Sequence, residues 1–317
     1  MQTNLAPVCL FVYNRLEETK QTIKALQNNF LAPKSHLYIF SDGSKNENSR
    51  SKVQAVRNYI HSIKGFKNVH VFESRTNKGL ATSIIDGVTK IINDYDRVIV
   101  LEDDLITTPN FLNFINQALE FYEFDKKIQS VNGFSLDLKS TIKYEKDVFF
   151  MDRTYSWGWA TWKNKWELCE FDEKHIRSSL NTNNIKEFKK YFGEDIFRML
   201  LSSLNGVNDS WYVRWVYSHF INSHFSVYPV ESKVFNIGYG TNATHCTTID
   251  VLETRHDSSF KVNFIMDKNI HVNKKLRKEF LNYFTYFYKL IYRIKLLKNS
   301  ATRKLLYLDI KQKMNKN

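Results

Sequence analysis

Short apolar runs alternate with helix-like segments over the first 120 residues, and no other property of the chain restricts the possible folds so strongly. The runs are residues 7–13, 36–40, 69–73 and 97–101, and the segments between them, expected to be helical, are 16–28, 52–63, 80–92 and 107–121. Pro109 is expected in the first turn of the last helix. This alternation predicts an α/β fold, a mainly parallel twisted sheet with helices on both faces.

The positive charge is concentrated at the C-terminal end. The 317 residues carry a net charge of +13, of which residues 274–317 contribute +11 from 13 Lys and Arg against two acids. A nucleic-acid-binding domain more often carries its excess charge on the folded body, so we expect no nucleic-acid partner. The sequence predicts one folded domain over residues 1–273, followed by a helical basic tail over 274–317.

Aromatic and aliphatic residues lie between the basic residues of this tail, from Phe280 to Leu297. The pattern is typical of a basic amphipathic helix on an anionic membrane surface. The alternative is a helix packed on the domain with a solvated outer face. There is no apolar run of 18 residues and no basic head followed by an apolar signal segment. With three scattered cysteines, this predicts a cytoplasmic protein, peripheral on the inner face of the cell membrane.

Three acids, Glu102, Asp103 and Asp104, directly follow the fourth apolar run. Ligands of parallel α/β sheets bind beyond the carboxyl ends of the strands. Adjacent carboxylates repel one another, so the group favours a cation, and hard oxygen ligands suit Mg²⁺ or Mn²⁺. The alternative is a solvated acidic turn.

Other strand ends carry polar residues as well. Asp42 follows the second run and can accept hydrogen bonds from a base or a ribose, or form an ordinary Asp-Gly turn. Arg75 and Lys78 can meet phosphates, with Gly79 allowing close backbone approach, or can be surface charges. The patterns GxGxxG and GxxxxGK are absent from these turns, which argues against dinucleotide and P-loop folds.

An ordered set of motifs between residues 5 and 246 carries a resemblance to a known family. The motifs are PVCLFVYNR, YIFSDGS, NKGLA, VIVLEDDL, YSWGWATWKNKW, NDSWYVRW and IGYGTNATHC. Their order resembles that of glycosyltransferases of the GT-A fold, close to family 2, and the acidic motif resembles that of N-acetylglucosaminyltransferase I. Family 2 enzymes commonly have two adjacent Asp residues after the second strand, whereas this chain has Ser41-Asp42.

The resemblance implies a nucleotide-sugar donor, UDP-linked, and a Mn²⁺ or Mg²⁺ cofactor. It implies that Asp104 coordinates the metal and that Asp103 and Glu102 hold the ribose or the sugar. Asp42 would contact the nucleobase. Residues 1–120 would then bind the nucleotide sugar, with Asn14 and Arg15 lining the pocket after the first strand, and residues 121–273 would bind the acceptor.

The resemblance also implies a catalytic base. Asp209 in Asn208-Asp209-Ser210-Trp211 is our first candidate, and Glu194 and Asp195 are the alternatives. The competing interpretation of Asp209 is a helix N-cap.

All six tryptophans lie between residues 157 and 215. Trp157, Gly158, Trp159 and Trp211 are expected to form an acceptor platform on which sugar rings stack, and burial in the core is the alternative. His245 follows a Gly-rich turn and is a tentative metal ligand, or else a structural histidine.

We therefore expect an inverting, metal-dependent glycosyltransferase of the hexosyltransferase type. It would move a sugar to a hydroxyl of a glycan or lipid-linked acceptor during surface polysaccharide synthesis. A nucleotidyltransferase that forms nucleotide sugars is the second hypothesis, although the Gly-rich first turn of that class is missing. A non-catalytic protein that binds sugars or membranes is the third.

Overall fold

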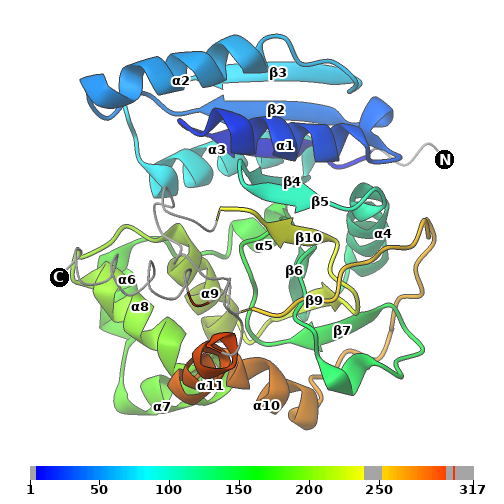
Figure 1. Cartoon of the computed structure of the whole chain (residues 1–317). Coiled ribbons are helices and arrows are strands. Elements are labelled where there is room, and N and C mark those ends of the chain that lie inside the picture. The colour runs from blue at the N-terminus through cyan, green and yellow to red at the C-terminus, as the bar shows by residue number, and fades with distance from the viewer. Residues whose placement is uncertain (1–4, 239–251, 298–302, 304–317) are drawn as a thin grey trace.

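An eight-stranded sheet runs through the molecule in the order β3-β2-β1-β4-β8-β6-β9-β7 (Figure 1). The computed structural model describes residues 5–238, 252–297 and 303. The strands of this sheet are β1 (Val8–Val12), β2 (His36–Ser41), β3 (Asn68–Glu73), β4 (Arg97–Glu102), β6 (Ile128–Asn132), β7 (Val148–Met151), β8 (Trp159–Trp162) and β9 (Phe225–Pro229). Only β8 and β7 run antiparallel to their neighbours. The predicted mainly parallel sheet is therefore confirmed.

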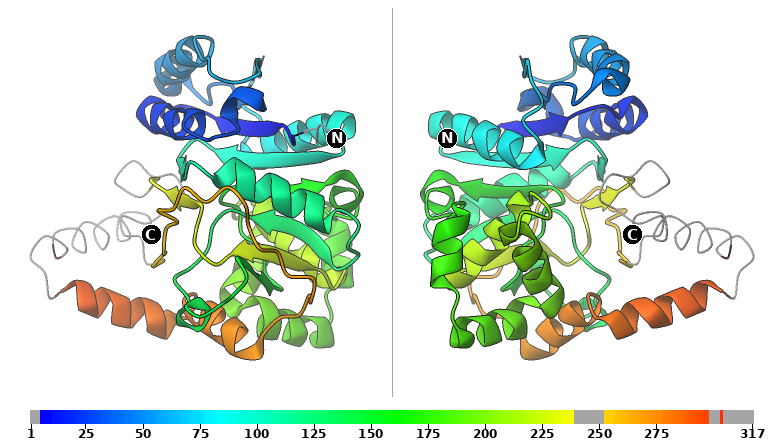
Figure 2. Two further views of the ribbon diagram at one scale, coloured as in Figure 1. Left: turned by 90° about the vertical axis from the view of Figure 1, so that its right-hand side faces the viewer. Right: turned by 90° about the vertical axis from the view of Figure 1, so that its left-hand side faces the viewer.

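Helices cover both faces of the sheet (Figures 1 and 2). One face packs against α1 (Leu16–Gln27), α2 (Glu47–Ile60) and α4 (Phe111–Tyr122), and the other packs against α3 (Leu80–Tyr95) and α9 (Trp211–Ile221). Successive side chains of a strand point to opposite faces. In β4, accordingly, Ile99 and Leu101 join the first core and Val98 and Val100 join the second.

The remaining elements build the half of the molecule beyond β4. A small antiparallel sheet pairs β5 (Leu105–Thr107) with β10 (Val234–Asn236). The helices α6 (Glu173–Ser179), α7 (Thr182–Phe192) and α8 (Glu194–Leu204) pack with α9 around a separate apolar cluster. The short elements are α5 (Lys163–Trp166), η1 (Ala32–Lys34) and η2 (Lys139–Thr141).

Two helix starts differ from the prediction. The second helix begins at Glu47 and not at residue 52, because Asn46 and Ser49 form a reciprocal capping box. The fourth begins at Phe111 and not at residue 107, so Pro109 precedes the helix. Residues 105–107 instead form β5, whose partner strand β10 lies more than 120 residues further along the chain.

The C-terminal segment divides into a packed helix and an exposed one. In α10 (Lys274–Asn282), Leu276 and Phe280 are buried in a cluster with Tyr228. Arg277 of this helix donates to both carboxylate oxygens of Asp152. No residue of α11 (Tyr286–Leu296) is fully buried. Packing on the folded domain therefore continues past residue 274, through α10. The alternative of a helix packed on the domain with a solvated outer face describes α10.

Candidate active site

The three acids lie where the strand order of the sheet reverses. The chain passes from β1 through β2 to β3 on one side and then returns to place β4 on the other side of β1. Open α/β sheets bind ligands in the crevice at such a point, beyond the carboxyl ends of the strands. Asn14 and Arg15 follow β1, Glu102 is the last residue of the adjacent β4, and Asp103 and Asp104 follow it. The fold therefore brings together two motifs that are nearly 90 residues apart.

Arg15 is the positive partner of the acids. Its Nη1 donates to Asp104 Oδ2 at 3.0 Å, and its Nη2 donates to Asp103 Oδ1. The Asp103 and Asp104 side chains are only 5% and 10% exposed. The solvated-turn alternative therefore does not describe them.

One guanidinium leaves this site with an excess of negative charge. Burial raises the pKa of Glu102 to about 8, and repulsion from Asp104 and Asp103 adds to the effect. Burial also raises the pKa of Asp103 to about 6, although Arg15 opposes the shift. The site is therefore suited to additional positive charge.

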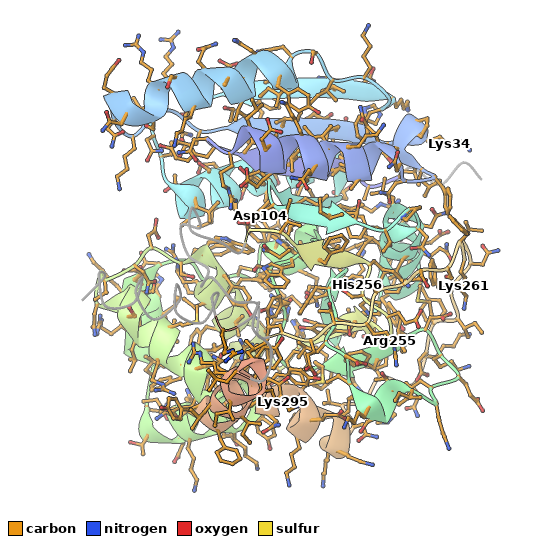
Figure 3. All side chains as sticks on the ribbon, viewed as in Figure 1. Lys34, Asp104, Arg255, His256, Lys261 and Lys295 are labelled. Atoms are coloured by element: carbon orange, nitrogen blue, oxygen red, sulfur yellow. The ribbon has the colours of Figure 1, made fainter. Side chains whose placement is uncertain are left out.

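The backbone around the acids is held by contacts from distant segments. Thr22 Oγ1 of α1 donates to Asp103 O at 2.9 Å, and Ile237 N donates to Asp104 O at 2.9 Å. A Cβ on Gly238 would lie only 2.1 Å from Asp104 Oδ2, so any larger residue after Ile237 would have to displace this carboxylate. Figure 3 shows Asp104 beside β5 and β10, the small sheet that delivers this glycine.

Asp42 anchors the loop before α3. Its Oδ1 accepts the N–H groups of Gly43 (2.8 Å) and Lys78 (2.9 Å), and its Oδ2 accepts those of Gly79 and of the Asn77 side chain (both 3.0 Å). Four donors thus converge on one carboxylate. This geometry favours the turn alternative, and contact with a nucleobase stays a prediction.

A pocket of about 490 Å³ lies next to this loop, between the ends of β2 and β3 and the helix α3. Asp42, Arg75 and Lys78 line it together with Phe40 and Phe72. Arg75 and Lys78 are exposed, and Lys78 pairs with Asp86 at 3.0 Å. No protein atom lies within 4 Å of the place that a Cβ on Gly79 would take, and close approach of a phosphate to this glycine stays a prediction. This glycine is favoured by its φ of 79°.

The three candidate bases differ in their surroundings. Glu194 is 54% exposed and pairs with Lys189 at 3.4 Å. Asp209 is 59% exposed, and its Oδ1 accepts a hydrogen bond from Arg214 at 2.6 Å. The Asp195 side chain is 16% exposed and pairs with the buried Arg153 at 3.0 Å. Asp195 is therefore committed to a structural ion pair, and Asp209 keeps an accessible carboxylate. No side-chain cap is formed by Ser210, the N-cap residue of α9, so an N-cap role does not explain Asp209.

Stacked rings connect the helix that follows Asp209 to the strand that carries the acids. Trp211, two residues after it, stacks on Trp159 with ring centroids 5.2 Å apart. Trp159 in turn pairs with Val100 on β4, two residues before Glu102.

The family Glycosyl transferase family 2 matches residues 8–192, more than half of the chain. The chain belongs to this family. It is therefore a glycosyltransferase, and its sheet and helix arrangement is that of the GT-A fold. The resemblance of the acidic motif to N-acetylglucosaminyltransferase I stays a prediction.

Solved structures of glycosyltransferases also resemble the chain, at low similarity. TarS of S. aureus is 14% identical with a TM-score of 0.28, over 40% of this chain and 21% of that one. A structure of TarS residues 1–349 is 12% identical with a TM-score of 0.39, over 73% of this chain and 60% of that one. The mannosyltransferase PcManGT of Pyrobaculum calidifontis, in complex with GDP-Man and Mn²⁺, gives 11% identity and a TM-score of 0.37 over 69% of this chain and 72% of that one. The chain thus spans less than two thirds of either TarS chain. No curated protein matches it.

Burial changes the interpretation of the tryptophans in this family 2 enzyme. Trp159 is 0% and Trp211 3% exposed. The ring of Trp159 stacks on those of Trp211 and Trp166 and lies tilted against that of Trp215. Rings with covered faces cannot stack on a sugar, so the core alternative applies to both. Gly158 is buried against Val234 as well. Trp157 is half-buried and remains a prediction for acceptor binding.

The acids fit a divalent cation of the kind that GT-A enzymes commonly use. Mg²⁺ and Mn²⁺ take one or two protein carboxylates and complete their shells with water and substrate phosphates. Asp103 and Asp104 supply such a pair. No cluster of three His, Cys, Asp or Glu side chains forms among the residues that the structure describes. His245 lies outside the described residues.

Sequence reasoning missed the segment from Asn236 to Gly238 as part of the site. The motif IGYGTNATHC begins within it, at Ile237, but the pairing of β10 with β5 is what carries the segment to Asp104. The reciprocal contact between Arg15 and the two acids was also missed, because each motif was interpreted at its own strand end.

Proposed function

We propose that this glycosyltransferase moves a sugar from a UDP-linked donor to a hydroxyl of a glycan or lipid-linked acceptor, with inversion and with Mn²⁺ or Mg²⁺ as cofactor. The observation that carries the proposal is the buried acidic group at the reversal point between β1 and β4, with Arg15 beside it. Surface polysaccharide synthesis is the process that such a reaction would serve.

The donor would lie across the carboxyl ends of β1, β2 and β4. Asp104 would hold the metal, which when bound neutralises charge on the departing diphosphate. Asp103 and Glu102 would bind the ribose or the sugar, and Asn14 and Arg15 would line the diphosphate pocket.

The nucleobase would enter near the loop that Asp42 anchors. The hydrogen bonds to Asp42 would keep that loop in shape, and Arg75, Lys78 and Gly79 would border the pocket. UDP is our choice from the sequence resemblance, and a panel of nucleotide sugars decides between it and other donors.

Asp209 would act as the general base. The acceptor hydroxyl oxygen attacks the anomeric carbon, its proton passes to the Asp209 carboxylate, and the bond to the diphosphate oxygen breaks with its electron pair. A single direct displacement inverts the anomeric centre. The Arg214 guanidinium at 2.6 Å orients Asp209. Trp157 would contact the acceptor, and Glu194 and Asp195 are the alternative bases.

We also propose that the exposed face of α11 binds an anionic membrane surface. Phe287, Leu290, Ile291, Ile294 and Leu297 recur at helical spacing and are between 38% and 68% exposed. Basic side chains, including Lys295, accompany this face. Figure 3 shows Lys295 on α11, well apart from Asp104. None of the described helices is long and apolar enough to span a bilayer. A membrane-bound acceptor would reach the active site from this surface.

The proposal is tested by assaying the full chain with nucleotide sugars, Mn²⁺ and glycan or lipid-linked acceptors. Asp104→Asn should lower turnover by about 10²–10³-fold, and Asp209→Asn should lower turnover while donor binding stays near wild type. Asp94→Asn, at an exposed position on α3, is the matched control and should retain activity. Full activity of Asp104→Asn would contradict the enzyme proposal. Pyrophosphate exchange from a nucleoside triphosphate and a sugar phosphate would favour the nucleotidyltransferase.

A further inference from the structure

Arg15 occupies the position that a cation on Asp104 would need. Its two terminal nitrogens contact different carboxylates, Nη1 at 3.0 Å from Asp104 Oδ2 and Nη2 on Asp103 Oδ1. We infer that Arg15 is an internal counter-ion that keeps the metal-binding carboxylates closed until a nucleoside diphosphate draws its guanidinium away. This inference rests on the proposed function and specifies the order in which donor and metal bind.

Two groups crowd one carboxylate oxygen of Asp104. The oxygen that accepts from Arg15 is Oδ2, and the backbone of Gly238 stands close to the same atom, as the 2.1 Å approach of a hypothetical Cβ shows. A cation that coordinates Oδ2 therefore competes with the guanidinium for this atom. An Arg held by two buried carboxylates is a strong competitor, since charge-assisted hydrogen bonds are the strong class.

The backbone of Arg15 can stay in place while its side chain turns away. Arg15 is the N-cap residue of α1, and its carbonyl accepts from the Thr19 N–H at 3.0 Å and from the Thr19 hydroxyl at 2.6 Å. The side chain is 21% exposed, so it lies at the boundary between the acids and solvent. A rotation of side-chain torsions is sufficient to open the site.

A diphosphate is the partner that can take Arg15 from the acids. The planar guanidinium matches phosphate oxygens in a bidentate manner. Arg15 also precedes the first turn of a 12-residue helix, where the helix dipole favours negative charge. As the guanidinium moves to the diphosphate, Asp103 and Asp104 lose their counter-ion and their affinity for a divalent cation rises. Metal binding therefore follows nucleotide binding.

The test is direct Mn²⁺ binding to the full chain, measured by electron paramagnetic resonance or calorimetry, without nucleotide and then with UDP or GDP. Arg15→Gln should bind Mn²⁺ about tenfold or more tightly than wild type when no nucleotide is present, because a competing charge is gone. The Mn²⁺ affinity of Arg15→Lys without nucleotide should lie between those of wild type and Arg15→Gln, since one ammonium cannot bridge both carboxylates. Arg50→Gln, at an exposed position on α2, is the matched control and should bind as wild type does.

Equal nucleotide-free Mn²⁺ affinity of wild type, Arg15→Gln and Arg15→Lys would overturn the inference. If Arg15→Gln fails to fold, the Arg15→Lys comparison decides alone. The wild-type chain could bind Mn²⁺ only when nucleotide is present, and the Arg15 variants could show the same Mn²⁺ affinities as wild type. That result would refute the counter-ion role and leave the proposed function standing. No Mn²⁺ binding by any variant, with or without UDP or GDP, would refute the metal-dependent function as well.

Discussion

Replacing Phe280 by Ala tests whether α10 is part of the folded domain. Phe280 is 0% exposed, and its ring centroid lies 5.5 Å from that of Tyr228 on β9 and 5.4 Å from that of Phe284. The ring therefore connects the C-terminal segment to the edge of the central sheet. A free tail would not bury an aromatic side chain in this way.

The expected loss is large. Truncating a buried Phe to Ala costs about 3–5 kcal/mol, because the apolar transfer energy is lost and a cavity remains. Typical domains are stable by about 5–15 kcal/mol, so the variant would lose a substantial share. For a chain of this length, 4 kcal/mol corresponds to a fall in Tm of about 6 °C.

Phe287→Ala is the matched control. Phe287 lies seven residues further on and is 68% exposed, so its truncation should change the free energy of unfolding by less than about 0.5 kcal/mol. Urea denaturation of both variants measures the difference. Co-sedimentation with anionic vesicles should show the opposite order of effects. Phe287→Ala should bind vesicles more weakly than wild type. Phe280→Ala, measured under conditions well below its unfolding midpoint, should bind them about as wild type does.

Equal unfolding midpoints for the two variants would refute the assignment of α10 to the core. Unchanged vesicle binding of Phe287→Ala would argue against docking through α11. Deleting residues 274–317 cannot separate these roles, because it removes Phe280 and the Arg277–Asp152 ion pair as well.

Further predictions concern acid stability and two close-packed glycines. Burial lowers the pKa of His219 to about 3, so below pH 6.5 the unfolded chain binds a proton that the folded one does not. Stability should therefore fall by up to about 1.4 kcal/mol per pH unit, and His219→Gln should flatten this dependence in urea titrations between pH 7 and 4. Gly238→Ala should displace the Asp104 carboxylate and abolish most transfer activity; a fully active variant would contradict this. Gly43→Ala, whose Cβ would lie 2.4 Å from Thr76 C, should raise the donor KM, and an unchanged KM would refute it.

The sequence alone determined the features that depend on neighbours along the chain. Alternating apolar runs and amphipathic segments predict the parallel sheet, because period and length are local properties. The acids after β4 and the polar residues after β1 and β2 could be assigned to one sheet edge, since parallel strands present their carboxyl ends together. The family resemblance depended on an ordered set of motifs that includes these strand ends, and the match to residues 8–192 confirms family 2.

Only the tertiary structure decided the rest, because packing joins residues that no local pattern relates. The pairing of β5 with β10 brings Gly238 to Asp104, and the adjacency of β1 and β4 lets Arg15 contact two acids at once. Trp159 and Trp211 are buried by rings from other segments, although their spacing suggested an exposed platform. The basic tail divides into the packed α10 and the exposed α11 for the same reason. An aromatic residue is equally suited to a core or a surface, and the space left by its neighbours determines which one it occupies.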